Sequence, residues 1–256
     1  MNVADATLVA AAIAAIVLLR MGLWMSFREG AGPAERLPAS ARDAISRTAA
    51  IAALAGLPLG FLVLAVKASE PGGLAAVDTA IVELVARYRS ETLVSAFGWI
   101  TQLGDTASLA AVAIVATGVL WAHGPRDTLV PVWFVIIGAE GTTWTAKFVI
   151  DRARPEFLFD VAASSPSFPS GHATGSLALY GILAYVIARG LETRRARFEV
   201  AYWAGVVIVL ISFSRIYVNV HHPTDVFAGL IVGGFWLVIG ILSFERVRHL
   251  LPALRQ

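Results

Sequence analysis

The stretch from Ser214 to Asp225 reads Ser-Arg-Ile-Tyr-Val-Asn-Val-His-His-Pro-Thr-Asp and separates two long apolar segments. His221 and Asp225 are four residues apart, a spacing that puts two side chains on one face of a helix. Asp225 then accepts the proton of one ring nitrogen of His221, and the other nitrogen keeps a lone pair for a substrate. Arg215 adds a positive charge. The stretch therefore indicates a nucleophilic imidazole, although a loop histidine followed by a helix-start acid gives the same pattern.

The overall composition is that of a membrane protein. Of the 256 residues, 57% are hydrophobic and 15% are charged, and the mean hydropathy is +0.73. Soluble proteins have about 25% charged residues. The chain has no cysteine, which excludes disulfides, thiolate nucleophiles and cysteine-based metal sites, and a net charge of +2 does not suggest nucleic-acid binding. We expect a single membrane domain over residues 1–256.

Six apolar segments predict an all-α, polytopic membrane helix bundle. They are Thr48 to Val66, Ala107 to Ala122, Leu129 to Ala146, His172 to Ala188, Glu199 to Phe213 and Val226 to Phe244. Residues 1–47 are expected to form an N-terminal helix and loop. Whether residues 5–25 make an additional span or an interfacial helix stays open, because their apolar run is short.

The segment from Asp78 to Ile100 has a different pattern. Its apolar residues fall on one helical face and its charged residues on the others, as in an amphipathic helix lying on the membrane surface. The apolar face consists of Val77, Ile81, Leu84, Val85 and Tyr88. A partly buried helix packed on the bundle fits the same pattern, and both interpretations stay open.

Three polar clusters lie at the ends of the predicted spans. They are Lys147 to Pro155, Pro169 to His172 and Ser214 to Asp225. In the six-span count they follow the third span, precede the fourth and lie between the fifth and sixth. An even number of crossings separates them, so all three face the same side of the membrane.

Together these clusters supply groups that suit a phosphoryl centre. The arginine fork matches phosphate oxygens, and the cations are Lys147, Arg154 and Arg215. Ser170 and Gly171 open a helix whose free N–H groups bind anions. Two histidines are then available, one to attack and one, His172, to protonate the leaving oxygen.

Each of these residues also has a simpler interpretation. The cations can mark a membrane boundary, Ser170 can be an ordinary helix cap, and His172 can be a surface histidine. We interpret Arg152 as solvated. Glu140 lies inside a span, where acids are rare and often functional, but an internal hydrogen bond explains it equally well, and we leave it out of the site.

The three clusters resemble the signature motifs of the type-2 phosphatidic acid phosphatase superfamily. The motifs are Lys-x6-Arg-Pro at 147–155, Pro-Ser-Gly-His at 169–172 and Ser-Arg-x5-His-x3-Asp at 214–225, all complete and in order. That superfamily includes membrane lipid phosphate phosphatases, glucose-6-phosphatase and soluble vanadium haloperoxidases. The resemblance covers roughly residues 107–244, which we expect to form the catalytic core.

The resemblance implies a role for each motif residue. His221 forms a phosphohistidine and Asp225 orients it, while His172 protonates the leaving group and later activates water. The phosphoryl oxygens are held by Lys147, Arg154, Ser170, Gly171 and Arg215. No cofactor or metal is implied, since the carboxylates near the site are too few for a magnesium cage.

We therefore expect an integral membrane phosphatase, independent of metal, that hydrolyses a lipid phosphate or diphosphate within the bilayer. Candidate substrates are undecaprenyl diphosphate, phosphatidylglycerol phosphate, phosphatidic acid and lipid A phosphate. One alternative is a phosphotransferase that passes the phosphoryl group to an acceptor lipid. A channel or transporter is disfavoured, because its polar residues would be spread through several spans. The sequence does not indicate which lipid is used or the oligomeric state.

The distribution of lysine and arginine predicts the orientation in the membrane. Apart from Arg20, the face opposite the motifs holds 12 of them: Arg28, Arg36, Arg42, Arg47, Arg126, Arg189, Arg194, Arg195, Arg197, Arg246, Arg248 and Arg255. The motif face holds 7: Lys67, Arg87, Arg89, Lys147, Arg152, Arg154 and Arg215. Positively charged loops stay in the cytoplasm. We expect a bacterial inner-membrane protein whose motif face is extracytoplasmic, which is the periplasmic side in a Gram-negative cell.

Overall fold

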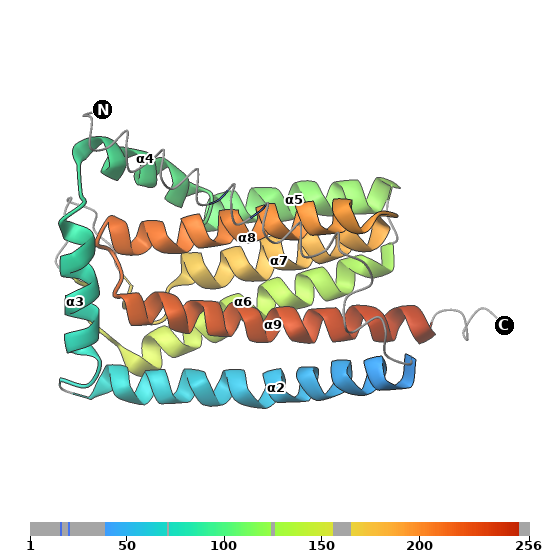
Figure 1. Cartoon of the computed structure of the whole chain (residues 1–256), viewed down its shortest axis with the longest axis horizontal. Coiled ribbons are helices and arrows are strands. Elements are labelled where there is room, and N and C mark those ends of the chain that lie inside the picture. The colour runs from blue at the N-terminus through green and yellow to red at the C-terminus, as the bar shows by residue number, and fades with distance from the viewer. Residues whose placement is uncertain are drawn as a thin grey trace.

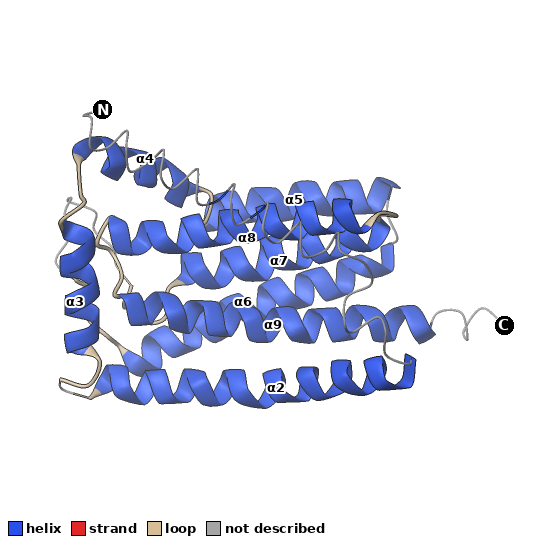
Figure 2. Ribbon diagram, viewed as in Figure 1, coloured by secondary structure: helices blue, strands red, loops and turns tan. Residues whose placement is uncertain are grey.

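A computed structural model describes residues 39–70, 72–123, 126–155 and 165–250, together with Ile16 and Arg20. The described residues form helices and loops without a strand (Figure 2). The helices are α2 (Ala39–Ser69), α3 (Ala75–Ala86), α4 (Glu91–Gln102), α5 (Thr106–His123), the 3₁₀ turn η2 (Arg126–Thr128), α6 (Leu129–Ile150), α7 (Gly171–Gly190), α8 (Arg194–Tyr217) and α9 (Pro223–Leu250). The all-α prediction is confirmed. The span considered for residues 5–25 lies outside the described residues, apart from Ile16 and Arg20.

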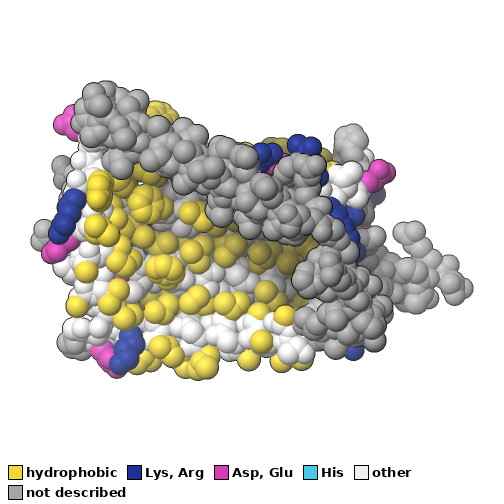
Figure 3. Space-filling view, viewed as in Figure 1, with side chains coloured by type: hydrophobic (Ala, Val, Ile, Leu, Met, Phe, Trp, Pro, Cys, Tyr) yellow, Lys and Arg dark blue, Asp and Glu magenta, His cyan; other side chains and the backbone are white. Residues whose placement is uncertain are grey.

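Five of these helices are long and apolar enough to cross a membrane, namely α2, α6, α7, α8 and α9. A sixth crossing arises if α4 and α5, which are bent by 43° at a short break, count as one span. Hydrophobic side chains are spread over the part of the bundle's flank that is drawn in colour, and charged ones lie toward its two ends (Figure 3). This distribution is the one expected of a bundle whose flank faces lipid. Helix α2 begins at Ala39, before the start of the apolar segment predicted at Thr48.

The long helices run antiparallel, whereas α3 crosses their ends (Figure 1). The end of α6, the start of α7, the end of α8 and the start of α9 lie at the end of the bundle that α3 covers. These four helix ends carry the three polar clusters, which therefore share one end of the bundle.

The prediction of one helix from Asp78 to Ile100 is wrong. The chain forms two helices, because a loop follows α3 and Ser90 caps the start of α4 by accepting a hydrogen bond from the Leu93 N–H at 3.3 Å. Ile81 and Val85 pack against a core cluster of α7, α8 and α9. The same inward face of α3 carries Asp78, whose side chain is only 1% exposed.

The predicted apolar face of α3 is therefore divided between core and surface. Val77, Leu84 and Tyr88 are about half exposed, at 50%, 54% and 54%. They point away from the bundle, while their neighbours Ile81 and Val85 face it. The packing of α3 on the bundle agrees with the second interpretation. The position of α3 on a membrane surface stays a prediction.

Glycines on α9 bring its backbone close to α7. A Cβ at Gly229 would lie 2.5 Å from the carbonyl oxygen of Ser170, and one at Gly233 would lie 2.7 Å from that of Thr174. Small residues four apart allow such close helix packing within membranes. The Ser170 N–H also donates to the backbone oxygen of Asp225 at 2.9 Å. The second and third motifs are consequently joined through main-chain contacts.

Candidate active site

His221 lies in the short turn between α8 and α9. The turn is closed by Asn219 in the left-handed conformation (φ 58°), which asparagine tolerates better than most residues. Arg89, from the α3–α4 loop, donates through Nε to the Tyr217 carbonyl oxygen at 2.9 Å. The side chain of His221 is only 2% exposed. The turn and the Arg89 contact therefore hold the backbone that precedes His221, whose imidazole is buried.

One ring nitrogen of His221 faces a carboxylate and the other faces a guanidinium. The Nδ1 atom lies 3.5 Å from Asp225 Oδ2. On the opposite side, Arg154 Nη1 is 3.3 Å from Nε2. Since a guanidinium only donates, Nε2 must be the acceptor and the ring proton must lie on Nδ1. In this tautomer Nε2 carries no proton, and its lone pair faces Arg154.

His221 is also kept uncharged. Its pKa is lowered to about 3, chiefly because burial disfavours the charged ring. Asp225 opposes this shift, whereas the positive charges of Arg215 and Arg154 add to it. At neutral pH the imidazole is neutral, as a nucleophile must be.

Ser167, which sequence analysis did not identify, also contacts Asp225 and His221. Ser167 donates its hydroxyl to Asp225 Oδ2, and its Oγ lies 3.5 Å from His221 Nδ1. Its side chain is fully buried. No sequence pattern marks Ser167, because it lies 54 residues before His221 in a loop. The hydroxyl fixes the same carboxylate oxygen that faces the imidazole.

The three predicted cations converge on the same region. Lys147 is only 5% exposed and donates to the Pro166 carbonyl. Arg154 donates to the Ser165 carbonyl at 2.8 Å as well as approaching His221. Burial lowers the pKa of Arg154, while Asp225 opposes the shift. The three positive charges therefore lie close together, an arrangement that suits an anion.

Arg215 belongs to this group but has a different set of partners. Its Nη1 donates to Thr101 Oγ1 at 2.8 Å, whereas its buried Nε has no hydrogen-bond partner among the described residues. Thr101 comes from α4, on which sequence analysis placed no site residue. A buried donor without a partner costs free energy unless a ligand satisfies it.

The start of α7 presents a second set of free donors. The Ser170 hydroxyl is buried without a hydrogen-bond partner among the described residues, and it makes no helix-capping bond. The ordinary cap considered for Ser170 is therefore not observed. The N–H groups of the first turn have no partner within the helix and point toward its positive end. The helix start thus has the character of an anion site.

These groups surround a cavity of about 150 Å³. It is lined by Gly104, Thr106, Leu109, Glu140, Thr143, Trp144, Lys147, Arg154, Ser165, Gly171, His172, Arg215 and His221. Six of the eight predicted site residues are in that lining, and the other two, Ser170 and Asp225, are buried beneath it. Glu140, which the sequence analysis left out, is in the lining too.

The interpretation of Arg152 as solvated is wrong. Its side chain is 13% exposed, and its guanidinium contacts Asp225 Oδ1 at 2.6 Å and Asp78 Oδ2 at 2.8 Å. Asp78 had been assigned to the outward charged face of an amphipathic helix. No pattern in the sequence pointed to this pair.

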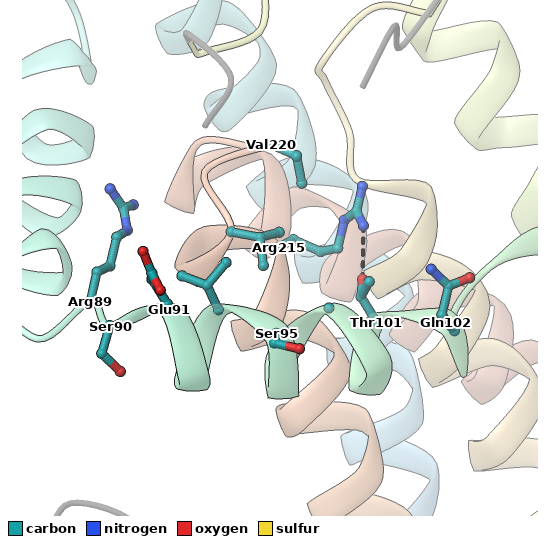
Figure 4. Close-up of a pocket in the computed structure, with 11 residues that line it drawn as sticks. Arg89, Ser90, Glu91, Ser95, Thr101, Gln102, Arg215 and Val220 are labelled. Carbon is teal, nitrogen blue, oxygen red and sulfur yellow. Dashed lines mark hydrogen bonds between the residues drawn. The ribbon is translucent and has the colours of Figure 1, made fainter. Parts of the chain in front are cut away.

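A larger pocket adjoins the first through Arg215 (Figure 4). Its volume is about 850 Å³, and it lies between α4 and the turn that follows α8. Figure 4 shows Arg215 and Thr101 at one end of it and Arg89 and Glu91 at the other. Apolar residues supply much of the remaining wall, namely Val94, Gly98, Val218 and Val220. The cation cluster therefore opens onto a partly apolar space.

Comparison with known proteins finds a matching family model and several similar chains. Residues 128–248 match the model of the PAP2 superfamily. Phosphatidylglycerophosphatase B of Bacillus subtilis is 32% identical over 193 residues, which cover 74% of this chain and 90% of that protein. Lipid A 1-phosphatase of Rhizobium etli is 32% identical over 110 residues, covering 39% of this chain and 43% of that protein.

A solved structure extends the similarity to three dimensions. The crystal structure of the first transmembrane PAP2 type phosphatidylglycerolphosphate phosphatase from Bacillus subtilis superposes with a TM-score of 0.70 at 28% identity. The alignment covers 76% of this chain and 97% of that one. Sequence, fold and complete motifs agree, and the chain belongs to the PAP2 superfamily.

Proposed function

We propose that this protein is a membrane phosphatase that hydrolyses a lipid phosphate or diphosphate through a phosphohistidine intermediate. The observation that carries the proposal is the arrangement around His221. A neutral imidazole turns its lone pair toward a cavity that also holds Lys147, Arg154 and Arg215. A cluster of buried cations beside an uncharged nucleophile suits a phosphoryl group, whose oxygens carry the negative charge.

In the first step His221 Nε2 attacks phosphorus and the bond to the leaving oxygen breaks. The phosphoryl oxygens replace the present partners of the cations and accept hydrogen bonds from the start of α7. His172, which lines the cavity, gives its proton to the leaving oxygen. The Nδ1 proton of His221 stays directed at Asp225, which stabilises the positive charge that forms on the ring.

In the second step His172 accepts a proton from water, and the resulting hydroxide attacks phosphorus. The N–P bond breaks, phosphate leaves and His221 returns to its neutral state. All of these transfers use side chains of this chain. The charge that divalent metals neutralise in other phosphoryl-transfer enzymes is opposed here by three cations and a helix start, which supports a metal-independent reaction.

A lipid substrate is supported by the surroundings of the site. The cavity lies at one end of an apolar bundle and adjoins the partly apolar pocket along α4. The named relatives act on phosphatidylglycerophosphate and on the 1-phosphate of lipid A. Phosphatidylglycerol phosphate is the first substrate to test, because the relative named for it is similar over most of its length.

Phosphate release from a panel of lipids tests the proposal. The purified protein in mixed micelles is expected to release phosphate from at least one of phosphatidylglycerol phosphate, phosphatidic acid, undecaprenyl diphosphate and lipid A phosphate. Glycerol 3-phosphate, which lacks the chains, is expected to react at least about tenfold more slowly because it does not gain the binding energy of the apolar pocket. Excess chelator is expected to leave the rate unchanged.

Each part of this experiment has an outcome that would contradict one part of the proposal. Failure to hydrolyse any lipid phosphate contradicts the function. Loss of activity in chelator that magnesium restores contradicts metal independence. Appearance of the phosphoryl group on an added acceptor lipid, without free phosphate, identifies a transferase instead.

We further propose that the site faces the extracytoplasmic side of a bacterial inner membrane. Among the described residues, the end away from the site carries Arg126, Arg189, Arg194, Arg195 and Arg197. Several positive residues on short loops favour the cytoplasmic side. Over the whole sequence apart from Arg20, the face that carries the motifs is predicted to hold 7 lysines and arginines against 12 on the opposite face. Three of the 7 line the cavity beside His221. This orientation suits a lipid phosphate presented on the outer leaflet.

Cysteine labelling measures the orientation. The native chain has no cysteine, so a single substitution gives a clean signal. Glu83→Cys, on the exposed side of α3, is expected to react with an impermeant maleimide in intact cells after outer-membrane permeabilisation. Glu192→Cys, exposed in the loop between α7 and α8, is expected to react only after the inner membrane is opened. The reverse pattern would overturn the orientation.

A further inference from the structure

Arg152 bridges two buried carboxylates at the back of the site. Its Nη1 donates to Asp225 Oδ1 at 2.6 Å and its Nη2 to Asp78 Oδ2 at 2.8 Å. The two acids are 0% and 1% exposed. They belong to different helices, since Asp225 is in the first turn of α9 and Asp78 in that of α3. One guanidinium thus links the covering helix to the carboxylate beside His221.

The local backbone directs Arg152 inward. Helix α6 ends at Ile150, and Asp151 adopts the left-handed conformation with φ 45°, which turns the chain. The Arg152 carbonyl then accepts a hydrogen bond from the Ser167 N–H at 2.8 Å. These main-chain features fix the position of the Arg152 backbone, from which the side chain reaches the two acids.

Each oxygen of Asp225 has a separate set of donors. Oδ2, which faces His221, accepts from the Ser167 hydroxyl and from the His222 N–H at 2.9 Å. Oδ1 accepts from Arg152. A carboxylate held at both oxygens cannot rotate, and its direction determines where the Nδ1 proton of His221 points. Removing Arg152 leaves one side of the carboxylate without its charged donor.

Besides its direct contact with Arg152, Asp78 is linked to it through Thr224, the residue that precedes Asp225 in the chain. The Thr224 N–H donates to Asp78 Oδ1 at 2.9 Å, and its hydroxyl donates to Oδ2 at 2.7 Å. The same hydroxyl accepts from Arg152 Nη1 at 2.8 Å. Although burial works against the charge, Asp225 and Asp78 raise the pKa of Arg152. The two acids, the guanidinium and the Thr224 hydroxyl form a closed network.

We propose that Arg152, anchored by Asp78 of α3, is a positioning residue that sets the orientation of the Asp225 carboxylate and, through it, of the His221 imidazole. This inference rests on the proposed phosphatase function. It makes α3 part of the active site, although the match to the family model begins at residue 128. Neither Arg152 nor Asp78 lines the cavity beside His221. The two residues are therefore expected to affect the chemical step and to leave phosphate binding unchanged.

The test separates positioning from folding by removing the buried charges singly and together. Arg152→Gln alone leaves Asp78 unpaired in the interior, which destabilises a protein strongly. The double variant Asp78→Asn/Arg152→Gln removes both charges of that pair and is expected to fold more stably than the single variant. Its kcat on the lipid that the wild-type protein hydrolyses is expected to fall about 10²-fold, the usual effect of a misplaced catalytic group. The inhibition constant for inorganic phosphate is expected to stay at the wild-type value.

The control pair is Glu83→Gln/Arg87→Gln, which makes the same chemical changes on the exposed side of α3 and is expected to leave kcat unchanged. If the double variant recovers wild-type kcat as well as thermal stability, Arg152 is only structural and the proposal is wrong. If the double variant does not fold, Arg152→Lys decides: a lowered kcat with unchanged phosphate inhibition supports positioning, and full activity refutes it. A wild-type protein that releases no phosphate contradicts the proposed function instead, so the two failures are distinguishable.

Discussion

Replacement of His221 by alanine is expected to lower phosphate release by at least about 10⁴-fold, because the variant lacks the atom that forms the bond to phosphorus. With labelled lipid phosphate, the wild-type protein is expected to yield an acid-labile, base-stable phosphoenzyme when the reaction is quenched in alkali. The variant is expected to yield none. Since His221 is almost fully buried, thermal unfolding of both proteins must be compared to show that the variant is folded.

The neighbouring histidine provides a matched control. His222 contributes its backbone N–H to Asp225, which an alanine at that position retains. His222→Ala is therefore expected to keep activity within about threefold of wild type, as is usual for a substitution that removes no site contact. An inactive His222→Ala beside an active His221→Ala would reverse the assignment. Loss of turnover with a normal amount of phosphoenzyme in His221→Ala would also refute it.

Replacement of His172 by alanine is expected to separate the two steps of the reaction. General acid catalysis contributes about 10²–10⁴-fold, so turnover of a lipid phosphate, whose alkoxide leaves poorly, should fall by that factor. p-Nitrophenyl phosphate has a leaving group that needs no proton. With this substrate the variant is expected to show a burst of p-nitrophenolate and to accumulate phosphoenzyme, because formation continues while hydrolysis still lacks its base.

Rapid-mixing measurement of the burst provides the decisive observation. The burst amplitude should approach one equivalent of enzyme, followed by a slow steady state. Equal losses of burst and steady-state rates with both substrates would show that His172 is needed for the site to assemble, and that it does not act as the acid. Wild-type turnover of the lipid by the variant would exclude any catalytic role.

The features that the sequence predicts well are those with local causes. Long apolar segments predict helices in a membrane because every backbone polar group must be satisfied within the segment. The three clusters lie at span ends, and counting the crossings places them together. Their residues do converge, since Lys147, His172 and His221 line one cavity.

The residues that sequence analysis missed share a different property. Thr101 and Ser167 each contact a predicted site residue at least 54 positions away, and Asp78 contacts Thr224, 146 positions away. None of the three is part of a motif pattern. Helical periodicity also gave the wrong face for Asp78, because a buried acid with an arginine partner occupies an inward position that the pattern assigns to apolar side chains. Contacts of this kind depend on tertiary packing, which a single sequence does not specify.

The hydrogen bond between Arg154 and Nε2 of His221 has a consequence for the end of the catalytic cycle. Because Nε2 of His221 accepts a hydrogen bond from Arg154, an incoming phosphoryl group must displace that donor. In the proposed mechanism, the free phosphate that forms in the second step competes against the same contact. As phosphate leaves, the Arg154 guanidinium is expected to return to His221. The free energy of that hydrogen bond offsets part of the attraction between phosphate and the three cations. The hydrogen bond between Arg154 and His221 is therefore expected to limit inhibition by free phosphate, even though the site has a high positive charge.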